Sequence, residues 1–168
     1  MNGGPRPRSG PEDQPTAAEI AAQSGLEFLQ GVLDGRYPAP PICAPMNYRL
    51  VEVAPGRAVF RGAPRFELMN PIGSIHGGWY GTLLDSCMSC AVQTMLPKGR
   101  LYTTLDYSVT LLRPLFADSP PVEAVGTAIH VGRRAGTAEG RIVGTEDGKL
   151  YATGTASCIV FEHSENTV

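Results

Sequence analysis

The sequence NPIGSIHGGWYGTLLDSCMSCAVQTML, residues 70–96, decides the fold of this chain. From residue 77 onward its apolar residues come in adjacent pairs every four positions, from Trp79-Tyr80 to Met95-Leu96. On a helical wheel these pairs fill one broad arc. The pattern predicts a long, largely buried helix over 77–96, ended by Pro97 and Gly99.

The segments on either side predict one short helical region and six strands. Residues 16–34 have helical periodicity, Gly25 allows two short helices there, and Gly35 is the expected stop. A proline-rich connector over 37–45 cannot be helical. Strands are expected on both sides of a turn at Pro55-Gly56, within 46–69, and then over 101–112, 122–131, 138–144 and 151–161, with turns at 132–136 and 146–148. The order favours an α+β fold in which a curved antiparallel sheet wraps one long helix.

The length of 168 residues suits one domain. We expect a disordered tail over 1–15, an N-terminal helical segment with its connector over 16–45, and the main domain over 46–163. The formal net charge of -2 gives no basic excess that would favour nucleic acid or membrane partners. No apolar run spans a bilayer and no secretory signal is recognised, so a cytoplasmic protein is expected.

The four cysteines are expected to be buried thiols. Cys87 and Cys90 have the spacing of a redox or metal pair. However, a redox pair gains its low thiol pKa at a helix N-terminus, whereas this pair falls in the middle of the predicted helix. A structural zinc site needs about four ligands, and no second pair has suitable spacing. We therefore expect no metal site.

Two glycines, Gly77 and Gly78, begin the long helix. They let the backbone approach another molecule closely. The first amides of a helix have no internal partner and carry partial positive charge. Such amides can hold a developing oxyanion, for example that of a polarised thioester carbonyl. The alternative is a plain turn followed by a helix start.

Asp85 lies on the same helix, away from the apolar arc and beside small residues. A carboxylate in a buried helix is costly unless it is paired or used. Ser89 follows one turn later, so its hydroxyl can bind a water or the carboxylate. The alternative is a solvated face, but such a face normally carries long polar side chains, and only Gln93 is of this type. The pattern favours a functional Asp85.

The spacing of Gly77 and Asp85 predicts an assembly. Eight residues at ~1.5 Å each place them about 12 Å apart along one helix. One carbonyl cannot reach both groups of one helix, because reacting groups must lie within ~3 Å of it. Two antiparallel helices can supply them. We therefore predict a two-fold dimer in which Gly77 of one chain faces Asp85 of the other.

The same segment resembles the signature of the 4-hydroxybenzoyl-CoA thioesterase superfamily, close to its PaaI-like (phenylacetic acid degradation) branch. Asn70, Gly73, His76-Gly77-Gly78 and Leu84-Asp85-Ser86 carry the resemblance. Segments 103–114 and 131–134 are also similar to the family, and the resemblance covers about residues 46–161. It implies a hotdog fold with an extra N-terminal helical segment, and acyl-CoA thioesterase activity in a homodimer or a dimer of dimers. No cofactor is implied, since CoA is part of the substrate.

The resemblance also implies a role for each matching residue. Asp85 would be the nucleophile or the general base for water, and the Gly77 amide would polarise the thioester carbonyl. His76 and Asn70 would orient the loop or the substrate near the thioester. Ser89 would supply a hydroxyl that positions water, and Thr104 a hydroxyl from the facing strand.

Other residues are candidates for substrate contacts. Arginines suit phosphate oxygens, so Arg113 and the pair Arg133-Arg134 are candidates for CoA phosphates, with ordinary exposed charge as the alternative. Gly78 lies beside the expected carbonyl. The acyl group is expected against the helix and the connector before it, with Trp79, Tyr80 and Met88 as candidates.

Two other functions compete with hydrolysis. A hotdog hydratase or dehydratase would need a His paired with a carboxylate for proton transfer at carbon, whereas His76 lies before the helix and Asp85 within it. A non-catalytic acyl-CoA binding module would have little use for a buried acid. The residues therefore favour hydrolysis of an acyl- or aryl-CoA thioester to the free acid and CoA.

Overall fold

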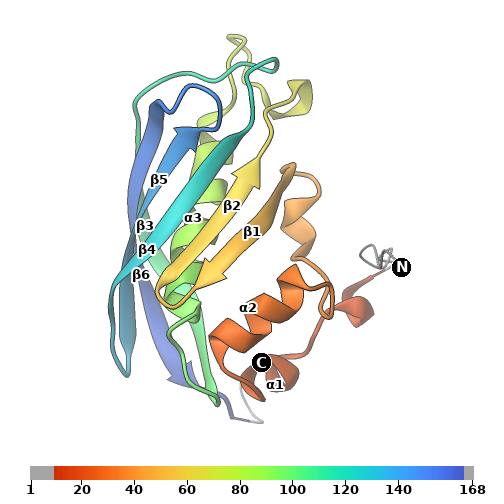
Figure 1. Ribbon diagram of the computed structural model, residues 1–168, viewed down its shortest axis with the longest axis vertical. Coiled ribbons are helices and arrows are strands. Elements are labelled where there is room, and N and C mark those ends of the chain that lie inside the picture. Colours follow the sequence, from red (N-terminus) through yellow and green to blue (C-terminus); the bar gives the residue numbers. More distant parts are fainter. Residues whose placement is uncertain (1–9, 165–168) are drawn as a thin grey trace.

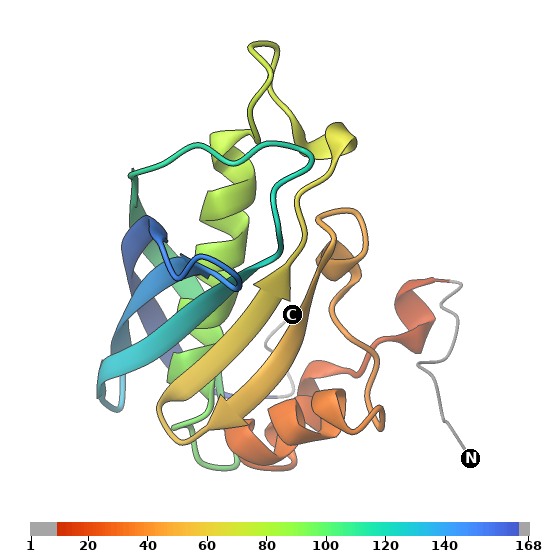
Figure 2. The same cartoon turned by 45° about the horizontal axis from the view of Figure 1, so that its top comes forward.

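The computed structural model describes residues 10–164 and shows one long helix lying along a six-stranded antiparallel sheet (Figures 1 and 2). The strand order is β1-β2-β4-β5-β6-β3. The strands are β1 (Tyr48–Ala54), β2 (Arg57–Gly62), β3 (Arg100–Leu111), β4 (Val122–Val131), β5 (Ala135–Gly144) and β6 (Leu150–Glu162). The predicted order of helices and strands is confirmed, as is the single wrapped helix.

The N-terminal helical segment divides as predicted, into α1 (Ala17–Ala21) and α2 (Gly25–Leu33). Thr16 and Ser24 cap the two helices, each accepting a hydrogen bond from a backbone amide three residues later. Gly35 follows α2 with φ 77°, the left-handed conformation that stops a helix. Both helices lie at the β1 side of the molecule, near the end of the long helix (Figure 1).

Within residues 10–164 short 3-10 turns occur in three places, two of them where the sequence predicted irregular chain. The proline-rich connector contains one, Pro41–Cys43, because proline suits the first position of such a turn. Another, Phe66–Leu68, follows β2. Of the predicted disordered tail, residues 1–9 lie outside the described residues, and Pro11–Asp13 form a third 3-10 turn.

The long helix α3 runs from Gly77 to Gln93, three residues shorter than predicted. After Gln93 the chain tightens, since the amides of Met95 and Leu96 bond to the carbonyls of Val92 and Gln93. The carbonyl of Leu96 then accepts the amide of Gly25 at 3.0 Å. The end of α3 is therefore set by the docking of α2, which no local pattern reveals.

A row of glycines crosses the sheet beneath α3. Gly126, Gly140 and Gly154 are direct cross-strand partners on β4, β5 and β6. A Cβ on Gly126 would lie 2.1 Å from the Cys87 carbonyl oxygen, and one on Gly140 would lie 2.7 Å from Met88 Cγ. The row therefore allows the backbone of α3 to lie close against the sheet.

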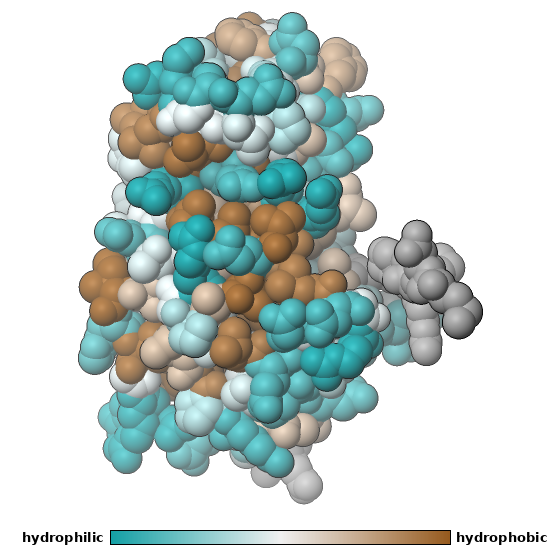
Figure 3. Space-filling model, in the orientation of Figure 1, coloured by the Kyte–Doolittle hydropathy of each residue, from teal (hydrophilic) through white to brown (hydrophobic). Residues whose placement is uncertain are grey.

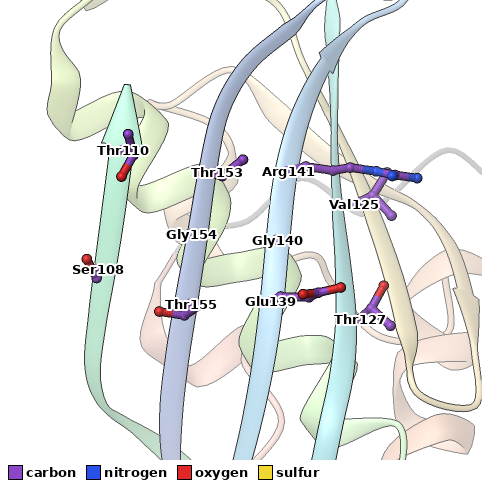
Figure 4. A pocket seen from close by; sticks show the side chains of 10 residues that line it. All are labelled: Ser108, Thr110, Val125, Thr127, Glu139, Gly140, Arg141, Thr153, Gly154 and Thr155. Carbon is purple, nitrogen blue, oxygen red and sulfur yellow. The ribbon is translucent and has the colours of Figure 1, made fainter. Parts of the chain in front are cut away.

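The opposite face of the sheet has a shallow hollow over the same strands (Figure 4). Glu139 and Arg141 flank Gly140 on β5 there, and Thr153 and Thr155 flank Gly154 on β6. None of the residues predicted to take part in catalysis lines this hollow.

Strand β5 begins at Ala135, three residues earlier than predicted. Gly136, which suggested a turn, lies within the strand, where a Cβ would meet Val92 Cγ1 at 2.5 Å. The glycine thus serves close packing against α3. All four cysteines are buried and, within residues 10–164, none forms a disulfide. No helix in that range is long and apolar enough to cross a membrane.

Candidate active site

Asp85 lies half-buried on α3, at the side of the helix that faces β3. The Thr104 hydroxyl on β3 donates a hydrogen bond of 2.8 Å to its Oδ1. Burial raises the pKa of the Asp85 carboxyl, and the hydrogen bond from Thr104 offsets this only in part. The structure therefore joins two predicted site residues that are 19 positions apart in the sequence. Their contact leaves Oδ2 as the second acceptor of the carboxylate.

Thr104 owes its position to an irregularity in β3. The register between β3 and β6 shifts between Thr104 and Asp106, so Leu105 is an extra residue, as in a β-bulge. Such a bulge changes which side chains face inward. Thr104 faces Asp85 before the bulge, and Tyr107 faces Gly81 of α3 after it.

Ser89 follows Asp85 by one helical turn and is 6% exposed. Within residues 10–164, no hydrogen bond joins Ser89 to the carboxylate. Ser89 instead interacts with the Tyr102 phenol. Burial raises the pKa of Tyr102 well above its usual value, and a hydrogen bond with Ser89 lowers it. Sequence reasoning missed Tyr102, because it lies on the strand before the recognised motif.

Asp85, Ser89 and Thr104 line one cavity of about 450 Å³. The cavity extends between α3, β3 and the N-terminal helical segment, and most of its other walls are apolar. Gly77 and Gly78 do not line it. Within one chain the two candidate half-sites, Asp85 and the start of α3, therefore lie apart, which is the separation that the helical spacing predicted.

The other half-site is the N-terminus of α3. His76 caps the helix, since its Nδ1 accepts the Gly78 amide at 2.9 Å and its carbonyl accepts the Trp79 amide. The Gly77 amide has no acceptor among residues 10–164. It is thus the donor at this helix start that remains available to a substrate.

Asn70 organises the loop that leads into α3. Its Oδ1 accepts the amides of Ile72 and Ser74, and its Nδ2 donates to the Ser74 hydroxyl. The side chain is therefore engaged within the loop, at the end of α3 that carries Gly77. Asn70 and His76 both shape the backbone around the free amide.

The candidate substrate-contacting residues are scattered. Arg113 is exposed and donates to the Leu150 carbonyl, near the start of α3. Arg133 and Arg134 are exposed in the turn between β4 and β5, at the other end of the sheet. Trp79 differs from expectation: it is 2% exposed and its indole N–H donates to the Met46 carbonyl.

Tyr80 and Met88, the other candidates for acyl contacts, are also buried away from the cavity. Tyr80 accepts the Leu115 amide and donates to the Arg113 carbonyl. Met88 packs against the glycine row. Both belong to the core, because the apolar arc of α3 packs on the sheet.

The free edge of β3 carries large apolar side chains that the chain itself leaves uncovered. Leu105 is 70% exposed, and Tyr107 and Leu111 are about half exposed. Tyr107 packs over the buried Gly81, and Leu111 lies beside the half-buried Gly77, so the strand edge adjoins the start of α3. An exposed apolar edge strand is a template for pairing with another chain.

Comparison with known proteins defines the class. Residues 72–151 match the profile of the thioesterase superfamily. The fold, the motif and this match show that the chain belongs to the thioesterase superfamily and has its hotdog fold.

Two similar solved structures come from Thermus thermophilus. The TT0310 protein is 30% identical with a TM-score of 0.64, over 71% of this chain and 97% of its own. A mutant form of the phenylacetic acid degradation protein PaaI is 29% identical with a TM-score of 0.64, over 71% of this chain and 98% of its own. The second of these supports the PaaI-like resemblance.

A protein of Halobacterium salinarum with a provisional esterase name is 35% identical over 77 residues. The match covers 45% of this chain and 49% of that protein. The chain therefore spans about half the length of this curated relative.

Proposed function

We propose that this protein hydrolyses acyl-CoA thioesters to the free acid and CoA, at sites that two chains share. The observation that carries the proposal is the half-buried Asp85 carboxylate, held by Thr104 in the wall of a largely apolar cavity. Such a carboxylate is costly unless it is used. Its raised pKa makes the Asp85 carboxylate a stronger base, which favours removal of a proton from water near neutral pH.

The chemistry follows from the two half-sites. The Gly77 amide donates to the thioester oxygen and stabilises the negative charge that develops there. Asp85 either removes a proton from the attacking water or attacks the carbonyl itself; both routes need its ionised form. In the first route the water oxygen bonds to the carbonyl carbon, the carbon–sulfur bond breaks, and Asp85 passes the proton it removed to the sulfur, so CoA leaves as the thiol. In the second route Asp85 forms a mixed anhydride as the carbon–sulfur bond breaks and the CoA thiolate leaves. A water then cleaves the anhydride to the free acid and the Asp85 carboxylate, and its released proton goes to the thiolate. No cofactor takes part.

A two-fold dimer brings the half-sites together. The uncovered surface formed by the β3 edge and the start of α3 includes Leu105, Tyr107 and Gly78. If two copies meet there with antiparallel α3 helices, Gly77 of one chain approaches Asp85 of the other. The same pairing places the Arg113 end of one chain next to the Arg133 end of its partner, where both can contact CoA phosphates.

Release of CoA thiol from a panel of acyl- and aryl-CoA substrates tests the proposal. Asp85→Asn is expected to lower kcat by at least ~10²-fold. Asp118→Asn is the matched control, since Asp118 lies in the loop after β3 and not in the cavity. Thiol release by the wild type that Asp85→Asn does not reduce would refute the role of Asp85. A change in double-bond absorbance without thiol release would indicate a hydratase, and binding without turnover a binding module.

A further inference from the structure

The cavity at Asp85 continues far beyond the groups that the proposed reaction uses. It runs along α3 past Ser89 to Gln93, and β3 contributes Leu101 and Tyr102 to its second wall. Its third wall comes from α2 and the proline-rich connector. These residues precede the segment that matches the superfamily, which begins at 72.

The wall formed by α2 is apolar because of its helical spacing. Phe28, Leu29 and Val32 lie on one face and line the cavity. Gln30, which is exposed, lies on another face of the helix and not in the cavity. Figure 3 shows polar side chains gathered at the lower right, where Figure 1 places α2. A helix with this pattern buries its apolar face against the protein, and here part of that face borders a cavity.

Helix α2 is fixed in position by contacts at its first residue. A Cβ on Gly25 would lie 1.8 Å from the Gln93 carbonyl oxygen, so only glycine allows this approach. The Gly25 amide donates to the Leu96 carbonyl, and the Gly99 amide donates to the Ala21 carbonyl. The N-terminal helical segment is thus attached to the end of α3, so the wall that α2 forms has a fixed position in the cavity.

We propose that this cavity holds the acyl group and that α2 sets the acyl chain length which the protein accepts. The substrate class is a medium-length apolar acyl chain, with its thioester at Asp85 and its tail against Phe28 and Val32. This inference rests on the proposed function, since it places the thioester at Asp85.

The length of the cavity gives the size of the chain. From Asp85 to Gln93 is eight residues, or ~12 Å along the helix at ~1.5 Å per residue. An extended chain advances ~1.2 Å per bond, so about ten carbons fill this distance. The cavity of about 450 Å³ lies within the usual range for a small-molecule site.

The test is the dependence of kcat/KM on chain length, from butyryl- to dodecanoyl-CoA. In the wild type we expect kcat/KM to rise about fourfold per methylene up to about ten carbons and then to stop rising.

Val32→Phe fills the cavity. It is expected to lower kcat/KM for decanoyl-CoA at least ~10-fold while butyryl-CoA changes less than about twofold. Gln30→Phe, on the exposed face of the same helix, is the matched control and should keep the wild-type profile.

A second variant and a binding measurement keep the test decisive. Phe28→Ala enlarges the cavity and should move the optimum to longer chains. Binding of decanoic acid, measured by calorimetry, does not depend on catalysis. Val32→Phe should abolish this binding. If no acyl-CoA is hydrolysed but decanoate binds in this way, the cavity assignment stands and the proposed reaction fails. If hydrolysis occurs and both variants keep the wild-type chain-length profile, the cavity assignment is overturned alone.

Discussion

Replacing Gly77 by proline removes one hydrogen-bond donor from the site and little else. Gly77 is the first residue of α3 after the cap His76, a position where proline is favoured because its missing N–H has no partner within the helix. His76 has φ -63° and ψ 136°, which suits the residue before a proline. The Cβ of the added ring would lie 3.1 Å from Leu111 Cδ1, the one atom of residues 10–164 within 4 Å of that position outside the local chain.

The expected effect is therefore catalytic. Loss of an oxyanion donor typically lowers kcat ~10²- to 10³-fold. We expect this loss for Gly77→Pro in steady-state thiol release from acyl-CoA, with a melting temperature close to that of the wild type. Gly77→Ala keeps the amide and adds the same Cβ, and should lose less than about 10-fold.

The comparison has a clear refuting result. If Gly77→Pro folds normally and keeps kcat near that of Gly77→Ala, the Gly77 amide does not polarise the substrate. If both variants lose activity equally, the added carbon near Leu111 is responsible, and the reasoning about the donor fails.

Three further predictions concern stability and assembly. Because burial raises the pKa of Asp85, ionisation of this carboxyl lowers the free energy of unfolding; the loss is absent below the unfolded-state pKa and complete above the raised folded-state pKa. Asp85→Asn should therefore become more stable relative to the wild type as pH rises through this window. A difference in urea midpoints between the two proteins that does not change with pH would contradict this. Leu105→Lys on the β3 edge should give a monomer by sedimentation and lower kcat at least ~10²-fold. The control Ile129→Lys on β4 should keep both the dimer and the activity, and an active Leu105→Lys monomer would refute the shared site. Gly126→Ala should lower the free energy of unfolding by about 1–3 kcal/mol, because the new Cβ would lie 2.1 Å from the Cys87 carbonyl oxygen. Thr127→Ala, at the next position, is the control, and similar losses for both variants would show that α3 can move away from the sheet freely.

Much of the fold could be predicted because its signals are local. The paired apolar positions of 77–96 identify α3, and turn residues such as Gly56 and Gly148 separate the strands. The errors lie where tertiary contacts decide. The end of α3 depends on Gly25 of a distant helix, and Gly136 lies within β5 because Val92 packs against it.

The site was predictable in its residue types but not in its partners. Asp85 and Gly77 follow from the motif and helical spacing. The hydrogen bond from Thr104 depends on how β3 crosses α3, and the bulge at Leu105 leaves no clear mark in the sequence. The burial of Trp79 could not be separated from a substrate contact, since both suit an apolar position.

The measurement that tests the shared site most directly uses dimers of two inactive variants. Asp85→Asn and Gly77→Pro chains, carrying different tags, are coexpressed and the mixed dimers are purified. Each mixed dimer has one site with both wild-type groups, so about half of wild-type kcat per dimer should return. If the purified mixed dimers are as inactive as either parent, Asp85 and Gly77 act from the same chain and the central claim is wrong.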